Sequence, residues 1–421
     1  MQSRTLLLAA ALTLASGACG SYPTPPEQVP DVAPPVAVNR LVPATPEEAG
    51  MMGSLPARLD SILDAAIAGG VTPGAAIAVG RHGRLVHLAG RGRTDWDQTS
   101  PEVTPATIYD LASLTKVIAT TTLAMMLEEE GSLDLDAPLG RYLFELTDTT
   151  KAALTPRLLL THRAGLPAWA SLWQEHEGRE AFLHAIDELE LVAPPGTEAV
   201  YSDLGIILLQ LAIERLGLAP LDDLARERIF APLGMDDTGF NPSAEARARI
   251  APTEHDSIRG GLVHGVVHDE NAFALGGVAG HAGLFGSARD LAVFAQMLLQ
   301  GGSYGDVHIA RPAAVTRWTA PQEDGSSRAL GWDTSSGRSS AGRYFSPWSF
   351  GHTGFTGTSL WMDPGRDLFV VLLTNRVNPT REERGHIALR RAVADAVQSA
   401  VLDAPTIDWE ARREPAAPVG R

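Results

Sequence analysis

The spacing of apolar residues predicts β-strands near both ends of the chain and helices between them. Apolar positions recur at helical spacing from Leu55 to Ile67 and stop at a pair of glycines, which predicts a helix with one buried face. The next stretch, GAAIAVGRHGRLVHLAGRG, consists of two β-type runs around His82 and Gly83. This turn chemistry predicts a hairpin.

A second hairpin is predicted late in the chain, where TSLWMDPGRDLFVVLLTN places Asp363–Gly365 between two strand-like runs. A helical pattern follows from about Thr380 to Val401. The segments between the hairpins are mostly helical, including Val117–Glu130 and Ile206–Leu216, each closed by a glycine. We therefore expect an α+β fold, with a central antiparallel sheet built from both ends of the chain and flanked by helices.

The N-terminus differs from this globular part in composition. Residues 1–18 hold one arginine, an apolar run and then small residues, which is typical of a secretory signal peptide. The segment is also similar to bacterial lipoprotein signals, so we expect cleavage after Ala18 and lipidation of Cys19. Ser16 occupies the place where such signals usually have leucine, and a cysteine without this role is the alternative.

Composition also sets the domain boundaries. Residues 19–49 are rich in proline and predict an extended linker. A polar tail is expected at 403–421. The remaining domain, 50–402, takes its sheet from about 50–112 and 330–402 and its helical insert from about 117–325.

The overall charge excludes one class of partner. The chain has 421 residues, of which 44% are hydrophobic and 20% charged, enough for a large core. A net charge of -16 argues against nucleic acid, because a phosphate backbone selects dense basic patches. Cys19 is the only cysteine, so no intramolecular disulfide can form.

Lysine is rare in this sequence, and one of the two lysines stands in a chemically suggestive place. The other 32 basic residues are arginine, which cannot lose its proton in a protein, whereas a desolvated lysine can. Ser113 and Lys116 are three residues apart before the apolar run VIATTTLAMML, which places both in the first turn of a helix. The pair suggests an activated nucleophile, and the alternative is a solvated lysine. For Lys151 we expect only a solvated lysine without a catalytic role.

Two further stretches strengthen this interpretation. AVYSDLGIILLQ puts Tyr201 and Asp203 before a buried helix, and FGHTGFTGTSLWMDP puts His352–Gly354 at the start of the late hairpin. In order, Ser113-x-x-Lys116, Tyr201-x-Asp203 and His-Thr-Gly resemble the three motifs of penicillin-recognising serine hydrolases. The branch they resemble contains class C β-lactamases, D-alanyl-D-alanine carboxypeptidases and esterases, and the resemblance covers roughly residues 50–400. It implies a β-lactamase/transpeptidase-like fold.

The resemblance also implies a mechanism. Ser113 would attack a carbonyl and form an acyl-enzyme, with Lys116 and Tyr201 sharing the role of base. The backbone N–H groups of Ser113 and Phe355 would hold the oxyanion. No cofactor is expected. On its own, Tyr201 could equally be an ordinary core tyrosine.

Two departures from the family pattern bear on the substrate, which Asp203, His352, Thr353 and Gly354 are expected to contact. Asp203 stands where many members have asparagine, and its carboxylate can pair with Lys116 and keep it charged. A charged Lys116 cannot accept a proton, so this departure favours Tyr201 as the base. His352 replaces a lysine common in β-lactamases and would be mostly neutral near pH 7. We therefore expect neutral esters to be preferred over penicillins. An ester, an amide and a cell-wall peptide all remain possible substrates.

A metal-dependent hydrolase is the first rival. The stretch HGVVHDE spaces His264 and His268 by four residues beside Asp269 and Glu270, and His281 follows. On a helix this spacing would form a zinc pair. The segment is rich in glycine, so we expect no shared ligand face and no metal.

A non-catalytic cell-wall binding protein is the second rival, and the intact Ser113, Lys116 and Tyr201 argue against it. We expect a monomer in the periplasm or cell envelope, with a small ester, an amide or a peptidoglycan-derived peptide as its partner and membrane contact only through a lipid anchor. Four tryptophans are expected either to line a cleft or to fill the core: Trp169, Trp173, Trp332 and Trp348.

Overall fold

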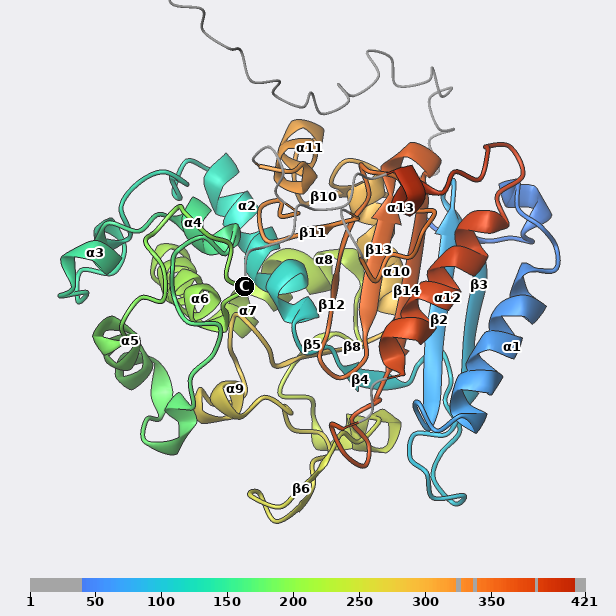
Figure 1. Ribbon diagram of the computed structural model, residues 1–421, viewed down its shortest axis with the longest axis horizontal. Coiled ribbons are helices and arrows are strands. Elements are labelled where there is room, and N and C mark those ends of the chain that lie inside the picture. Colours follow the sequence, from blue (N-terminus) through green and yellow to red (C-terminus); the bar gives the residue numbers. More distant parts are fainter. Residues whose placement is uncertain (1–39, 323–326, 336–338, 383–384, 413–421) are drawn as a thin grey trace, which may run out of the picture. The chain divides into compact units, whose positions relative to one another are not determined.

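A seven-stranded sheet forms the centre of the structure. The structure is a computed structural model, and it describes residues 40–322, 327–335, 339–382 and 385–412. The strand order is β1-β3-β2-β14-β13-β12-β11, so strands from the two ends of the chain meet between β2 and β14 (Figure 1). The expected α+β architecture is confirmed. The strands are β1 (Val42–Pro43), β2 (Gly74–Arg81), β3 (Arg84–Gly92), β11 (Asp333–Thr334), β12 (Phe350–Thr353), β13 (Ser359–Asp363) and β14 (Leu368–Thr374).

The pairing of the sheet is antiparallel except at one edge. β1 pairs in parallel with β3, so the expectation of a wholly antiparallel sheet is wrong there. Both predicted hairpins form. His82 and Gly83 have φ of 53° and 70°, the left-handed turn that connects β2 to β3 with a matching twist. Residues 364–367 connect β13 to β14.

The two faces of the sheet face different helices because side chains alternate along a strand. Odd-numbered residues of β2 from 75 to 79 join the core under α1 (Leu55–Ala68) and α12 (His386–Ser399). Residues 76 and 78 join the larger core that includes α10 (Ala288–Leu299). The sheet is therefore buried on both sides (Figure 1).

α12 is shorter than the helix predicted from the sequence. Residues 380–381 are not part of it, because Arg381 is held by ion pairs to Glu254 and Glu270. The helix begins at His386 and packs against α1.

The inserted region is mostly helical, as expected, but it also contains strands. A three-stranded sheet joins β4 (Ile108–Asp110), β8 (Leu284–Ser287) and β5 (Gly239–Phe240), and two short hairpins pair β6 (His255–Asp256) with β7 (Gly261–Leu262) and β9 (Ser303–Tyr304) with β10 (Val307–His308). Its helices are α2 (Thr122–Glu129), α3 (Thr149–Ala152), α4 (Pro156–Leu160), α5 (Gly178–Glu188), α6 (Asp203–Gly217), α7 (Leu221–Ala225), α8 (Ala231–Leu233), α9 (Glu270–Ala274), α10 and α11 (Pro312–Thr319).

In the described part of the chain, no single helix is long and apolar enough to cross a membrane. α6 and the segment Leu221–Leu233 reach that length and apolarity only together, and they are bent by 72° relative to each other.

Both boundary segments are more ordered than their composition predicts. Within the predicted linker, the backbone N–H of Ala44 donates to the carbonyl of Leu85, next to the pairing of β1 with β3. Within the predicted tail, α13 (Trp409–Arg412) places Trp409 edge-on against Trp348, and Asp403 pairs with Arg81 at 2.6 Å. The described residues 40–49 and 403–412 thus belong to the folded domain. The predicted signal peptide and Cys19 lie outside the described residues.

Candidate active site

A sharp turn between β4 and the following helix presents Ser113. Ala112 has a positive φ of 48°, which is unfavourable for a residue with a Cβ. The buried Asp110 side chain holds this turn, because its two carboxylate oxygens accept from the N–H groups of Ala112 (2.8 Å) and His268 (2.7 Å). The sequence predicts Ser113 within the first helical turn, whereas in the structure it lies in the turn just before the first helical residue.

Lys116 is buried one helical turn from Ser113, with only 1% of its surface exposed. Its Nζ donates to Ser113 Oγ at 2.9 Å and to the carbonyl of His281 at 3.0 Å. It also lies 2.7 Å from Asp203 Oδ1. An ammonium can donate three hydrogen bonds, and these three oxygens all lie within 3.0 Å of Lys116 Nζ.

Lys116 is held in its charged form. Burial lowers the pKa of the ammonium, but the charge of Asp203 and the interactions of the ammonium with Asp203 and Tyr201 outweigh burial, so the pKa of Lys116 is raised. A lysine that keeps its proton at neutral pH cannot accept the proton of Ser113. The arrangement leaves Tyr201 as the remaining base candidate.

Tyr201 lies at the start of α6 and faces Lys116. Ser202 caps this helix by accepting from the N–H of Gly205. Lys116 Nζ is 5.0 Å from the centroid of the Tyr201 ring, and the His352 ring is 5.9 Å from it. The structure therefore brings the residues of all three sequence motifs together.

His162 also belongs to this cluster, although the sequence analysis did not single it out. Its ring lies 4.5 Å from that of Tyr201, its Nδ1 accepts from the N–H of Ser202, and its carbonyl accepts from the N–H of Val200. It thus brackets Tyr201 on both sides along the backbone. The only sequence signal is its place in LLLTHRAGLP, before a glycine turn.

The two histidines near Tyr201 are neutral. Burial, followed by the charges of Arg328 and Lys116, lowers the pKa of His162 well below its usual value. The pKa of His352 is also lowered well below its usual value, by burial and then by the charges of Lys116 and Arg328. His352 Nδ1 lies 2.9 Å from the carbonyl of Thr353, so Nδ1 carries the proton and Nε2 is a buried acceptor with no partner among the described residues.

Arg328 supplies a permanent cation that the sequence analysis missed. Its guanidinium carbon lies 5.2 Å from the centroid of the Tyr201 ring, and its Nη1 is 3.8 Å from Asp333 Oδ1. It comes from the segment before β11, outside every motif, so no spacing in the sequence connects it to Ser113. The neutral His352 is therefore accompanied by a cation from another element.

The segment after β12 docks onto the Ser113 turn. The hydroxyls of Thr356 and Thr358 donate to the carbonyls of Asp110 and Leu111. Gly354 permits this approach, since a Cβ there would lie 2.1 Å from Thr358 Oγ1 and 2.5 Å from the carbonyl of Leu111.

This docking brings the predicted oxyanion-binding residues Ser113 and Phe355 into the same region. Within the described residues neither backbone N–H has a backbone acceptor. Phe355 itself is half exposed, and its ring stacks on that of His268 at 5.8 Å.

The histidines of the metal alternative separate in the structure. His264 Nε2 contacts the carbonyls of Arg247 and Ile250, whereas His268 pairs with Glu254 at 2.8 Å.

Two other residues of that alternative, Asp269 and His281, lie together with Asp203 within the catalytic cluster. Atoms of Asp203, Asp269 and His281 lie within 4.8 Å of one another. The ammonium of Lys116 sits against this group, bonded to Asp203 and to the carbonyl of His281. The carboxylates therefore already have a cation. His281 Nε2 is 2.9 Å from Asp269 Oδ1, and the pKa of Asp269 is lowered, with burial opposing the charge of His281 and its hydrogen bond.

Comparison with known proteins identifies the family. The sequence profile described as Beta-lactamase matches residues 59–395. The chain belongs to the β-lactamase family. Members of this family are serine hydrolases, and the match spans the Ser113, Tyr201 and His352 motifs. The resemblance drawn from those motifs is confirmed.

Curated relatives of this β-lactamase-family chain share about a third of its sequence. A protein of Escherichia coli (strain K12) named "Putative D-alanyl-D-alanine carboxypeptidase" is 34% identical over 343 residues, covering 71% of this chain and 79% of the relative. A protein of the same name from Salmonella agona (strain SL483) is 32% identical over 336 residues, covering 73% and 76%.

Solved structures share the fold. EstCE1, described as a hydrolase with promiscuous acyltransferase activity, superposes with a TM-score of 0.66 at 24% identity, covering 82% of this chain and 98% of that one. A penicillin-binding protein homologue from Caulobacter crescentus gives 0.68 at 20% identity, covering 83% and 99%. A class C β-lactamase gives 0.67 at 17% identity, covering 81% and 96%.

Proposed function

We propose that this serine hydrolase is a carboxypeptidase that removes a C-terminal D-amino acid from cell-wall peptides. The observation that carries the proposal is the position of Arg328 beside Tyr201. A guanidinium binds a carboxylate through two parallel hydrogen bonds, which suits the free C-terminus of a peptide. A neutral ester has no carboxylate for the guanidinium to bind. The names of the E. coli and Salmonella relatives support the same substrate class.

In the proposed reaction, Ser113 Oγ forms a bond to the scissile carbonyl carbon while Tyr201 accepts the serine proton. The charged Lys116 stabilises the phenolate that receives it. The N–H groups of Ser113 and Phe355 stabilise the oxyanion. Tyr201 then delivers the proton to the leaving amine, and the C–N bond breaks. Water resolves the acyl-enzyme by the same steps in reverse order, which frees Ser113.

The proposed location is outside the cytoplasm. The signal-like residues 1–18 support export, and Cys19 with the proline-rich linker supports a lipid anchor that holds the domain away from a membrane. Growth with radiolabelled palmitate tests the anchor. Label that is absent from the wild-type chain would refute it, and Cys19→Ser is the control that should remain unlabelled.

Labelling and product release together test the enzyme assignment. Intact mass after treatment with a fluorophosphonate probe should show one adduct, absent in Ser113→Ala. Release of D-alanine from an acyl-D-Ala-D-Ala peptide tests the substrate class, with p-nitrophenyl butyrate and nitrocefin assayed in parallel. A protein that binds such peptides but neither labels nor turns over would be the non-catalytic binding protein.

The role of Arg328 has its own test. Arg328→Gln should lower the peptide-to-ester ratio of kcat/KM by about tenfold, the effect of one lost charge-assisted hydrogen bond. Arg328→Lys keeps the charge and should retain part of the preference. An unchanged ratio in Arg328→Gln would remove the main support for a carboxypeptidase and favour an esterase.

A further inference from the structure

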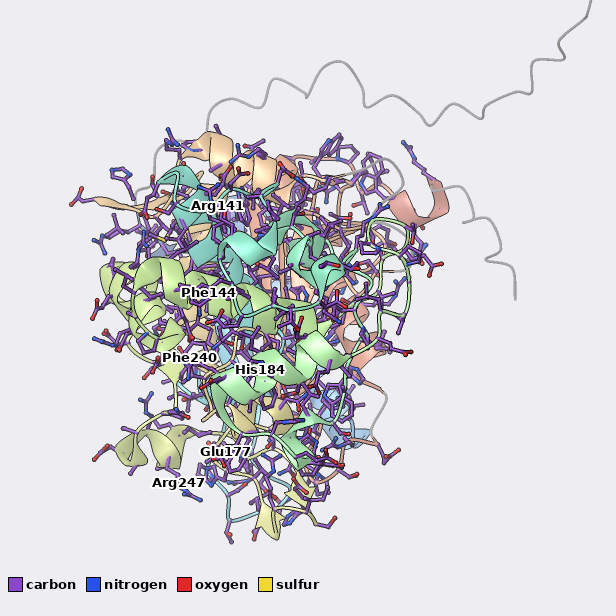
Figure 2. All side chains as sticks on the ribbon, turned by 90° about the vertical axis from the view of Figure 1, so that its left-hand side faces the viewer. Arg141, Phe144, Glu177, His184, Phe240 and Arg247 are labelled. Atoms are coloured by element: carbon purple, nitrogen blue, oxygen red, sulfur yellow. The ribbon has the colours of Figure 1, made fainter. Side chains whose placement is uncertain are left out.

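Arg390, a buried arginine of α12, reaches the loop that follows the third sequence motif, and no step of the proposed reaction uses it. Only 7% of its surface is exposed. Arg141 and Arg247, by contrast, are exposed arginines (Figure 2). Within the described part of the chain, the guanidinium of Arg390 bonds to backbone carbonyls and to no carboxylate.

This environment is costly for a cation. Burial, followed by the charge of Arg376, lowers the pKa of Arg390 to about 9, so Arg390 is still charged at pH 7. A buried charge that bonds to carbonyls alone recovers less of its lost hydration than one that pairs with a carboxylate. Such a cost is typical of functional sites, which suggests a role for the loop that Arg390 holds.

The carbonyls that Arg390 binds all belong to residues 354–358. Its Nη2 donates to the carbonyl of Gly354 at 2.6 Å and to that of Thr358 at 2.8 Å. Its Nε donates to the carbonyl of Gly357 at 3.2 Å. One side chain from α12 therefore holds both ends of this loop, which connects β12 to β13.

The bond to Gly354 sets the direction of the Phe355 N–H. In a trans peptide the C=O and the N–H point in opposite directions, and the Gly354–Phe355 bond is trans. Because the Gly354 carbonyl points to Arg390, the Phe355 N–H points away from it. This N–H has no backbone acceptor within the described residues. The hydroxyl of Thr358 holds the same loop against the Ser113 turn.

The peptide that follows Phe355 is held by a second arginine. Arg376, just after β14, donates from its Nε to the carbonyl of Phe355 at 2.8 Å, and its guanidinium carbon lies 4.4 Å from the centroid of the Phe355 ring. Two cations from separate elements thus fix both peptide planes of Phe355. A cation bonded to a carbonyl also polarises the peptide, which makes the N–H of that peptide a stronger donor.

We infer that Arg390 is a positioning residue of the oxyanion hole, because it orients and polarises the Gly354–Phe355 peptide whose N–H stabilises the tetrahedral intermediate. The inference rests on the oxyanion role of Phe355 in the proposed function. It does not depend on which carbonyl substrate is cleaved, so a simple ester is sufficient to test it.

Arg390→Met keeps a long side chain and removes all three bonds. With p-nitrophenyl butyrate, kcat should fall by about tenfold or more and KM should change less, since losing a whole oxyanion donor costs about a hundredfold or more in kcat. Affinity for butylboronic acid, whose tetrahedral adduct with Ser113 places an oxygen in the oxyanion hole, should fall by a similar factor. Arg390→Lys keeps the charge and should recover part of both.

Arg366 provides the matched control at the other end of β13. It is 8% exposed, and its guanidinium donates to the carbonyls of Gln398 and Pro405 and to Gln398 Oε1. Arg366→Met should lower Tm by an amount similar to that of Arg390→Met. The kcat of its folded fraction and its affinity for the boronic acid should equal those of the wild type.

Three outcomes would overturn the inference: an unchanged kcat in folded Arg390→Met, equal kcat losses in Arg390→Met and Arg366→Met, or a fall in kcat without a fall in boronic acid affinity. If Arg390→Met does not fold, Arg390→Lys and Arg366→Lys make the same comparison. A loss of about threefold in kcat and in affinity is then expected only in Arg390→Lys, and its absence would equally overturn the inference.

The same assays separate this result from the proposed function. A wild type that hydrolyses the ester but releases no D-alanine from the peptide would refute the carboxypeptidase, while the Arg390 comparison would still stand. A wild type that neither binds the boronic acid nor hydrolyses the ester would refute the catalytic assignment and the role of Arg390 with it.

Discussion

The environments of Lys116 and Lys151, the two lysines of the chain, differ in one respect that decides their roles. Both are buried, with 1% and 2% of their surfaces exposed. Lys151 Nζ donates to the carbonyl of Asp187 at 2.7 Å, near the C-terminal end of α5, and lies 3.6 Å from Asp148. The expectation that Lys151 is solvated is therefore wrong. Only Lys116 has a serine and a tyrosine beside it.

In this chain, therefore, both lysines occupy buried sites, but only one of them lies in the catalytic cluster. An ammonium fits a small site made of a carbonyl and a carboxylate, where the larger, planar guanidinium of arginine does not. The neighbouring groups, not the lysine, then determine what the site can do.

The largest expected difference between the two lysines is in turnover. Lys116→Arg should lower kcat/KM by about a thousandfold, because a planar guanidinium cannot bond to Ser113, Asp203 and the carbonyl of His281 from one point. Lys151→Arg should leave the activity of the folded fraction near that of the wild type. Steady-state kinetics with p-nitrophenyl butyrate compares them, and equal losses would erase the distinction.

Asp203→Asn tests whether Lys116 works as a cation or as a base. The carboxylate raises the pKa of Lys116 against the effect of burial, so its removal should lower that pKa. If the charged form is required, kcat/KM at pH 7 falls by about tenfold and the alkaline limb of the pH profile moves to lower pH. A rate increase at pH 7 would instead make neutral Lys116 the base.

His162 sharpens the comparison by testing the surroundings of Tyr201. His162→Leu should lower kcat by about tenfold or more, because the N–H of Ser202 loses its acceptor and Tyr201 loses its packing. His162→Asn can still accept that hydrogen bond and should recover part of kcat. KM should change less than kcat in both variants. Equal effects of the two substitutions would indicate packing alone.

The smallest effect is expected for stability at the second lysine. Lys151→Met keeps the length of the side chain but leaves the carbonyl of Asp187 without its donor, so Tm should fall by about 2–6 °C. Thermal unfolding monitored by circular dichroism measures the shift. A Tm equal to that of the wild type would show that water replaces the ammonium there.

The elements that could be predicted from the sequence are those with strong local patterns. The β2–β3 hairpin, α1 and the Ser113-Lys116 turn each follow from spacing and turn chemistry within a short stretch. The resemblance of three motifs then predicted that Tyr201, Asp203 and His352 would meet them. Each of those residues lies within a motif that has a recognisable local pattern.

The remaining site residues lack such a pattern. Arg328 and His162 reach Tyr201 only through the packing of distant segments, and no periodicity connects them to it. The order of residues 403–412 was missed for a similar reason, because a polar segment can be held by ion pairs such as that between Asp403 and Arg81. The composition of a segment indicates how hydrophobic it is, but it does not show whether its charged residues will find ion-pair partners in the folded protein.

The meeting of β2 with β14 has a consequence for the order of folding. During synthesis the β2–β3 hairpin emerges early, but its inner edge has no partner until β14 has left the ribosome, so the central sheet closes last. An exposed edge of this kind invites pairing with other chains. A chain cut short before β14 should therefore aggregate rather than fold. The same delay suits the proposed export, since a sheet that cannot close early leaves the chain unfolded for passage across a membrane.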